Sequence, residues 1–260
     1  MNHWTQLSID IANQMNYLDL LFQVYPCMPE EIRDIDQNKW DEVKRNFDNK
    51  NNKNLIKSLL GLPLFPIKDS YIAYLKRDKS AIDRNPETVN RICSRLYVMG
   101  LTKIFEQSTL PKETNRQIGP LFKRWISSDV LGIPLLPLTA FSNTKDNAIL
   151  VGSDADLKHY ASKHLGYTGT KGLDLLLRMH NKYVIGEAKF LTDFGGHQDR
   201  QLEDALSLLE DTSARAIHIA ILDGVLYIPG KHSMHRSLSL STEKAPILSS
   251  LVLREYLYQV

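Results

Sequence analysis

The sequence predicts an α/β fold in which a mixed central sheet is flanked by helices, together with a mainly helical N-terminal region. Through the first 125 or so residues, apolar side chains recur at the three- and four-residue spacing of amphipathic helices. From residue 148 onward, short apolar runs bounded by turn residues predict strands, and a helical pattern over residues 198–209 lies between two of them. Strands that alternate with a helix are typical of an α/β sheet.

The composition allows a substantial hydrophobic core. With 260 residues, of which 43% are hydrophobic, the chain is near the upper size of a single domain. We expect one compact unit, in which residues 1–135 form the mainly helical part and residues 136–260 contain the sheet. The formal net charge of +2 neither requires nor excludes a polyanionic partner, because a basic groove can coexist with an acidic surface elsewhere.

Several classes of protein are excluded by simple counts. The two cysteines, Cys27 and Cys93, lie far apart in apolar surroundings, so we expect reduced thiols and no zinc site. No basic stretch followed by an apolar run opens the sequence, and no apolar stretch approaches the roughly 18 residues of a membrane span. We therefore expect a cytoplasmic protein with no membrane partner.

The N-terminal helices are predicted from apolar spacing and from the prolines and glycines that interrupt it. The segment before Pro26 carries an apolar stripe, and Pro86 precedes the longest helical pattern. We expect helices at residues 9–25, within the polar stretch 28–48, at 51–60, from Pro86 to Phe105 and after Gly119-Pro120, and an irregular linker at residues 132–147.

The C-terminal elements alternate between strands and helices. Ser153, followed by two aspartates, is a good N-cap for a helix that runs to about Leu165. Residues 173–179 and 183–190 predict two antiparallel strands joined by a turn at Asn181. We further expect a short apolar run at 149–151, the helix at 198–209, and a hairpin of residues 216–222 and 225–228 around Asp223-Gly224.

Three charged residues stand out in the two antiparallel strands. Asp174 and Glu187 lie on neighbouring strands with twelve residues between them, so a hairpin would bring them together. Glu187 and Lys189 are two apart and project to one face, while Ala188 points to the other. Two converging carboxylates suit Mg²⁺, which favours oxygen ligands and keeps several waters, and a lysine beside them can orient water or stabilise developing negative charge.

The simpler interpretation of these residues is a surface salt bridge, worth about 0 to 1 kcal/mol. The flanking runs Leu175-Leu176-Leu177 and Val184-Ile185 instead indicate strands inside a core. Charges are costly to bury unless they are paired or bind a metal. We therefore favour a catalytic role.

The residues around this group resemble a known nuclease signature. Gly172-Leu173-Asp174 followed by Gly186-Glu187-Ala188-Lys189 resembles the PD-(D/E)xK motif, with Leu173 in place of the proline. Residues 190–201, and more weakly residues 115–125, are similar to segments of type II restriction endonucleases. The resemblance implies a restriction-endonuclease-like core, with Asp174, Glu187 and Lys189 as catalytic residues and Mg²⁺ bound by Asp174, Glu187 and the carbonyl of Ala188.

The resemblance also implies an activity. The expected enzyme is a type II restriction endonuclease that hydrolyses double-stranded DNA at a short specific sequence and leaves 5′-phosphate and 3′-hydroxyl ends. A homodimer would suit a palindromic site, because two identical subunits read two identical half-sites. The alternatives are a repair or junction-resolving nuclease with the same chemistry, and a DNA-binding protein without activity.

Candidate DNA contacts lie in three places, two of them within the mainly helical residues 1–135, which we expect to contribute to DNA binding. Arginine and glutamine suit bidentate contacts to base edges, although a solvated helix face is the plainer account. Gly195 and Gly196 either keep the backbone close to a phosphate or form an ordinary loop. Asp193 either assists metal binding through a water molecule or caps the following helix. The candidates are Arg116, Gln117, Lys123 and Arg124 upstream, and Gly195, Gly196, Gln198 and Gln201 after the second strand; Lys76-Arg77-Asp78-Lys79 faces phosphate or solvent.

Two other patterns give only weak evidence of a functional site. His232 with His235, and His159 with His164, lack the further ligands that a zinc site needs. The glycines at 166, 169 and 172 with Lys171 do not match a phosphate-binding loop, and a strand rather than a helix follows them.

Overall fold

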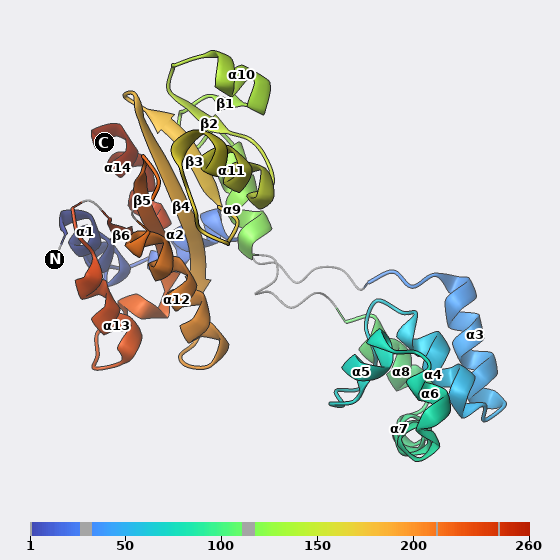
Figure 1. Cartoon of the computed structure of the whole chain (residues 1–260). Helices are drawn as coiled ribbons and strands as arrows, with labels where there is room; N and C mark the ends of the chain where they lie inside the picture. The colour runs from blue at the N-terminus through green and yellow to red at the C-terminus, as the bar shows by residue number, and fades with distance from the viewer. Residues whose placement is uncertain (1, 27–32, 111–117, 212, 244) are drawn as a thin grey trace. The chain divides into compact units, whose positions relative to one another are not determined.

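The structure is a computed structural model that describes all residues except 1, 27–32, 111–117, 212 and 244 (Figure 1). The chain divides into two compact units. The sheet unit comprises Met1–Cys27 and Thr114–Val260, and the helical unit comprises Met28–Glu113. The chain therefore does not divide at residue 135, and it does not form one compact unit, because its first helices belong with the sheet.

The sheet unit is built on a mixed sheet with the strand order β1-β2-β3-β4-β5-β6. β3 is antiparallel to its neighbours β2 and β4, whereas β1 pairs with β2, β5 with β4 and β6 with β5 in parallel. The α/β fold class is confirmed. The strands are β1 Leu135–Leu136, β2 Ala148–Leu150, β3 Leu175–Met179, β4 Lys182–Leu191, β5 Ile217–Gly224 and β6 Ile247–Leu248.

The predicted antiparallel strands are observed as the β3–β4 hairpin. Met179 pairs with Lys182, so the loop contains only His180 and Asn181. Both loop residues have positive φ, 48° and 65°, as a type I′ turn requires. The sequence predicts this hairpin well because its turn and its apolar runs are local features.

The hairpin predicted around Asp223-Gly224 is wrong. Both residues belong to β5, and the chain continues from them into the 3₁₀ segment Val225–Tyr227. Gly224 has φ of 101°, but this conformation ends β5 and does not form a turn to an antiparallel partner strand. Asp223 is fully buried and accepts hydrogen bonds from Tyr25 and Ser249, so tertiary contacts fix a conformation that the local sequence does not reveal.

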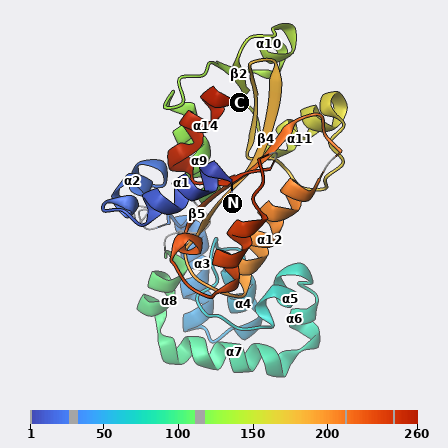
Figure 2. The same cartoon turned by 90° about the vertical axis from the view of Figure 1, so that its left-hand side faces the viewer.

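The helices cover both faces of the sheet (Figures 1 and 2). His218 on β5 reaches the carbonyl of Leu208 on α12 at 2.9 Å, and its strand partner is Ile185 on β4. Side chains alternate along a strand, so Glu187 and Lys189 share the α12 face with Ile185. The opposite face, which includes Ala188, packs in the core cluster with residues of α9 and α14.

The helices of the sheet unit differ from expectation at two places. A single helix over residues 9–25 is wrong, because Asn16 has φ of 68° and separates α1 from α2. Residues 132–147 are not only a linker, since they contain β1 and α10. The bounds are α1 His3–Ala12, α2 Tyr17–Val24, α9 Ile118–Ser127, α10 Leu138–Asn143, α11 Asp154–Tyr160, α12 His197–Glu210, α13 Ser233–Ser237 and α14 Leu253–Gln259, with a π-helical turn Ala161–Leu165 and 3₁₀ segments Leu238–Leu240 and Ser250–Val252.

The helix predicted after Ser153 is confirmed in detail. The Ser153 side chain accepts from the backbone N–H of Asp156, and the Asp156 side chain accepts from the backbone N–H of Ser153. This reciprocal capping satisfies two of the four free donors at the helix start. The π-helical turn then continues the helix to Leu165, as predicted.

The helical unit has its own hydrophobic core, which includes Trp40, Leu55, Ile92 and Cys93. The long pattern after Pro86 is divided by Gly100, which has φ of 78°. Cys93 is a free buried thiol, whereas Cys27 lies outside the described residues. No helix in the described part of the chain is long and apolar enough to span a bilayer. The helices are α3 Gln37–Asp48, α4 Asn52–Leu60, α5 Ile72–Arg77, α6 Ala81–Arg84, α7 Pro86–Met99 and α8 Leu101–Ser108.

Candidate active site

The β3–β4 hairpin places Asp174 opposite Glu187. Leu175 pairs with Gly186, so the residue before Leu175 lies beside the residue after Gly186. The backbone N–H of Asp174 donates to the carbonyl of Gly186 at 3.1 Å. Its Oδ2 accepts from the backbone N–H of Ala188 at 2.9 Å. The carboxylate of Asp174 is therefore fixed against the strand that carries the other two candidates.

The structure brings Asp174, Glu187 and Lys189 together. Nζ of Lys189 lies 2.5 Å from Oε1 of Glu187 and 3.6 Å from Oδ2 of Asp174. The side chains are 12% exposed for each acid and 22% exposed for the lysine. A partly buried ammonium thus lies between two carboxylates, one from β4 and one from Asp174, which directly precedes β3 instead of lying within the strand as predicted.

The electrostatics of this group are unusual for carboxylates. Burial, and then repulsion from Asp174, raise the pKa of Glu187 to about 7, even though Lys189 acts in the opposite direction. Burial lowers the pKa of Lys189, but the attraction of Asp174 and Glu187 outweighs this effect and the net pKa is raised. One ammonium therefore does not fully compensate the two acids.

This donor set fits a divalent cation. Two carboxylates close enough to raise the pKa of one of them favour an additional positive charge between them. Within a β-strand the N–H and C=O of one residue point to the same side, so the Ala188 carbonyl lies on the edge that also faces Asp174. Among the described residues no cluster of three or more His, Cys, Asp or Glu side chains is present, so backbone and water oxygens would complete the coordination.

Two further lysines lie near the group, of which Lys171 was not predicted as a site residue. Lys171 acts to lower the pKa of Glu187 and forms an ion pair with Asp204 of α12. Lys171-Gly172 directly precede Leu173-Asp174 in the sequence, which is the signal that could have indicated this placement. Lys123, a predicted DNA contact, lines a small pocket together with Asp174 and forms an ion pair with Asp154.

The loop between β4 and α12 contains the predicted glycines. Gly195 and Gly196 are exposed and have φ of 82° and 55°. Gln198 is buried, and its side chain donates to Oγ1 of Thr192 and accepts from the backbone N–H of Thr192. This amide therefore closes the loop on itself, whereas Gln201, one turn further along α12, is half-buried.

The remaining predicted residues have no described contact with Asp174, Glu187 or Lys189. Arg124 is exposed on α9, and Arg116 and Gln117 lie outside the described residues. Asp193 accepts from the backbone N–H of Phe194 in the loop, and it does not cap α12, whose N-cap residue is Gly196. The ring nitrogens of His232 and His235 contact the carbonyls of Ile228 and Leu226.

The comparison with protein families decides the class of this chain. A sequence model of the family described as Tsp45I type II restriction enzyme matches residues 2–260, which is nearly the whole sequence. The chain belongs to the Tsp45I type II restriction enzyme family. Membership confirms the predicted resemblance, and with it a site-specific deoxyribonuclease that binds and cuts DNA. No curated protein and no solved structure matches the chain.

The Tsp45I family match also bears on the alternatives. A repair nuclease and an inactive DNA-binding protein were both compatible with the motif alone, because the motif specifies only the chemistry of the site. The family assignment favours restriction over both. In this Tsp45I family member, the side chains of Asp174, Glu187 and Lys189 lie within hydrogen-bond or ion-pair distance of one another.

Proposed function

We propose that this restriction enzyme is Mg²⁺-dependent and that Asp174, Glu187 and Lys189 form its active centre. One observation carries the proposal: Glu187 and Lys189 of β4 and Asp174, which directly precedes β3, meet within hydrogen-bond or ion-pair distance in a partly buried place. Such a group is costly to maintain in a core without a function.

Each residue has a distinct role. Asp174 and Glu187, with the carbonyl of Ala188, hold the cation, and the N–H of Ala188 keeps Asp174 in place. When bound, Mg²⁺ polarises the scissile phosphate and offsets the negative charge of the transition state. Glu187 must lose its proton to serve as a ligand, which its raised pKa makes dependent on pH.

Lys189 acts as a charged donor in this proposal. Its raised pKa keeps the amine protonated at neutral pH, so it is poorly suited to accept a proton from water. The ammonium instead orients the attacking water and stabilises the charge that develops on the phosphate. Attack of water on phosphorus breaks the bond to the 3′ oxygen and leaves 5′-phosphate and 3′-hydroxyl ends.

The enzyme is further proposed to act in the cytoplasm as a homodimer on a palindromic or nearly palindromic site. Two-fold related subunits present the same reading surface to each half-site. In each subunit the candidate DNA contacts include Lys123 and Arg124 of α9, the exposed Gly195-Gly196 loop, and Arg116 and Gln117 upstream of α9. Sedimentation of the free protein and of its DNA complex tests this, and a strictly monomeric complex refutes it.

The test of the active centre is plasmid cleavage in the presence of magnesium. Asp174→Ala and Lys189→Ala are expected to abolish cleavage. Lys182→Ala is the matched control, because Lys182 is an exposed lysine on the same strand, β4. Full activity in either active-centre variant would remove the assignment.

The fragments from a long duplex distinguish restriction from repair. Discrete fragments with a common sequence at their ends are expected for a restriction enzyme. Cutting confined to branches, ends or damaged positions would contradict the proposed specificity while leaving the active centre intact.

A further inference from the structure

The basic charge of this protein is concentrated in one part of the helical unit. Residues 50–95 contain ten Lys and Arg side chains but only four Asp and Glu, a net charge of +6, whereas the whole chain has a net charge of +2. The rest of the chain therefore carries an excess of acid. A positive region on an otherwise acidic protein is a favourable surface for a polyanion.

Two arginines of α7 are held in place by a buried acid. NH1 and NH2 of Arg91 donate to the two carboxylate oxygens of Asp69 at 2.7 and 3.3 Å. NH1 of Arg95 lies 3.6 Å from the same carboxylate. The Asp69 side chain is only 6% exposed, whereas Arg91 and Arg95 are 45% and 55% exposed. The acid lies beneath the two guanidinium groups and orients them.

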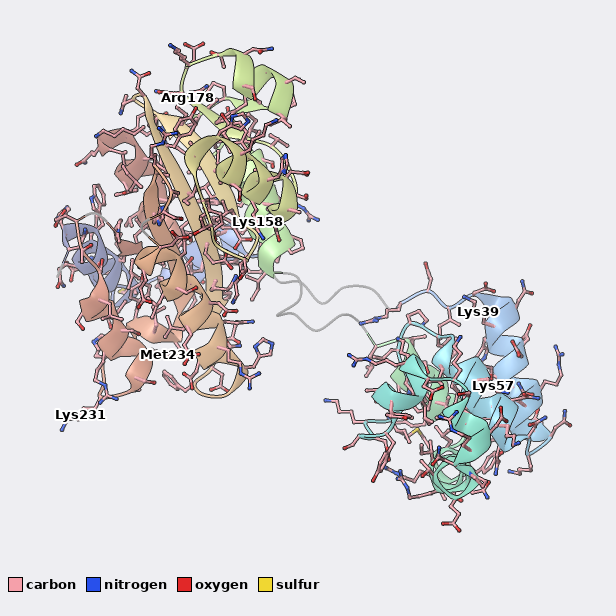
Figure 3. All side chains as sticks on the ribbon, viewed as in Figure 1. Lys39, Lys57, Lys158, Arg178, Lys231 and Met234 are labelled. Carbon is pink, nitrogen blue, oxygen red and sulfur yellow. The ribbon has the colours of Figure 1, made fainter. Side chains whose placement is uncertain are left out.

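Exposed tyrosines continue this surface along α5. The Arg91 guanidinium lies 5.5 Å from the centre of the Tyr71 ring, and Tyr71 is 59% exposed. Tyr74, one helical turn further along, is 60% exposed and adjoins Arg84, whose pKa is raised by its hydrogen bond to Asp78 and, to a smaller extent, by Tyr74. The contacts thus form two groups, Tyr71 with Arg91 and Arg95, and Tyr74 with Arg84. The two groups lie on adjoining elements, because α5 contacts α6 and α6 contacts α7 in the helical unit (Figure 3).

α7 presents one stripe of this surface. Arg91, Arg95 and Val98 are three and four residues apart, so they share a face of the helix. Val98 is 90% exposed and lies at the C-terminal end of this charged stripe. Glu87 shares the stripe at its first turn, where a carboxylate also stabilises the helix N-terminus.

We propose that this surface, formed by Arg84, Arg91, Arg95, Tyr71 and Tyr74, contacts double-stranded DNA and supplies part of the sequence recognition. The proposal rests on the DNA-cutting activity of the family and is independent of the residues proposed for catalysis.

The chemistry of the side chains favours duplex DNA. A guanidinium has five donors, and Arg91 uses two of them on Asp69, so the others remain for phosphate oxygens or for the O6 and N7 atoms of guanine. Arginines fixed by an acid lose less freedom on binding than mobile ones. Val98 offers an apolar contact of the kind that recognises the thymine methyl group.

The test measures DNA binding without cleavage. The full-length protein is titrated, in the absence of divalent cations, with a short duplex that contains a cleavage site mapped by digesting genome-length DNA and sequencing the ends. We expect Arg91→Gln to weaken binding about tenfold, and the triple variant Arg84→Gln, Arg91→Gln and Arg95→Gln to weaken it at least about a hundredfold. The slope of log Kd against log salt should fall by about 1 for each arginine that binds a phosphate and is replaced.

Matched controls separate binding from folding. Lys103→Gln is the control substitution, because Lys103 is an exposed, ion-paired cation of the same unit, on α8 and outside the surface. Tyr71→Ala and Tyr74→Ala remove exposed rings without leaving a buried charge, so they test the surface even if the arginine variants unfold. Melting temperatures identify any variant that is not folded.

The outcomes are distinct. Loss of affinity in the arginine or tyrosine variants, with Lys103→Gln unchanged, supports the surface. Wild-type affinity and salt slope in folded variants overturn it. Because Lys189→Ala should bind DNA normally and fail to cut it, failure of the active-centre proposal is recognised separately.

Discussion

Asp174 and Ala188 are joined by a hydrogen bond of 2.9 Å from the Ala188 backbone N–H to Oδ2 of Asp174. β4 therefore contributes twice to the site, through the side chains of Glu187 and Lys189 and through the backbone that holds the opposing acid. The position of Asp174 depends on β4 as well as on β3, which begins at the next residue. This coupling allows the charge of Asp174 to be tested separately from its position.

Asp174→Asn should retain the fold and lose activity. The amide oxygen of asparagine can still accept from the N–H of Ala188, but the negative charge that holds the cation is gone. We expect single-turnover cleavage to fall by at least about a hundredfold. Glu203→Gln on the exposed side of α12 is the control and should cleave normally. Asp174→Asn with wild-type rates would show that only the position of this side chain matters.

Stability should depend on pH through Glu187 when no metal is bound. Its pKa rises from 4.5 in the unfolded chain to about 7 in the folded protein, so the folded state holds the proton more tightly. The unfolded state binds fewer protons between these values, and stability falls as pH rises through this window. The shift corresponds to about 3 kcal/mol. A bound cation favours the ionised form and should relieve this loss.

Thermal melts with and without Mg²⁺ measure this effect. The rise in Tm on adding Mg²⁺ should be larger at about pH 8 than at about pH 6, because the cation competes with a proton at the lower pH. In Glu187→Gln the pH dependence of this rise should be largely lost. An equal rise at both pH values in the wild type would indicate that Glu187 is not a ligand.

Asp223→Ala should destabilise the sheet unit. Asp223 accepts from the hydroxyl groups of Tyr25 at 3.0 Å and Ser249 at 2.5 Å, and it is fully buried. Removing the carboxylate leaves these donors without their acceptor, which we expect to cost about 2 to 4 kcal/mol. Urea unfolding measures the change. Asp223→Asn retains one acceptor oxygen, so its free energy of unfolding should fall less. An equal fall in both variants would show that the stabilisation comes from the charge and not from the hydrogen bonds.

Gly224→Ala should be among the most disruptive single substitutions in β5. Gly224 has φ of 101°, and an added Cβ would lie 2.0 Å from the carbonyl oxygen of Leu191 on β4. Backbone atoms cannot move aside cheaply, so we expect a loss of about 3 kcal/mol or more. Gly119→Ala is the control, because nothing lies within 4 Å of an added Cβ at that position. An unchanged unfolding midpoint in Gly224→Ala would contradict this account of the strand end.

Local features of the sequence predict the centre of the fold and the candidate site. The β3–β4 hairpin depends on two short apolar runs and a two-residue turn, and the approach of Asp174 to Glu187 follows from that hairpin. The cap at Ser153 is equally local. These elements could be predicted because the residues that determine them are close together in the chain.

The errors have non-local causes. Asp223-Gly224 resembles a turn, but its conformation depends on Tyr25 and Ser249, far away in the sequence. The division into two units depends on the apolar residues of α1 and α2, which pack with the C-terminal segments. The Arg91–Asp69 pair joins α7 to a loop that precedes α5, and no periodicity in the sequence indicates this contact.

The two-part arrangement of the sheet unit sets an order of assembly during synthesis. The hydroxyl of Thr5 in α1 is hydrogen-bonded to the carbonyl of Ile247 and to the hydroxyl of Ser241, more than 230 residues later in the chain. The helical unit, whose contacts lie within Met28–Glu113, can form as soon as those residues leave the ribosome. α1 can pack in its final place only after nearly the entire remaining chain has been synthesised. The helical unit can therefore be folded before the proposed active centre is complete.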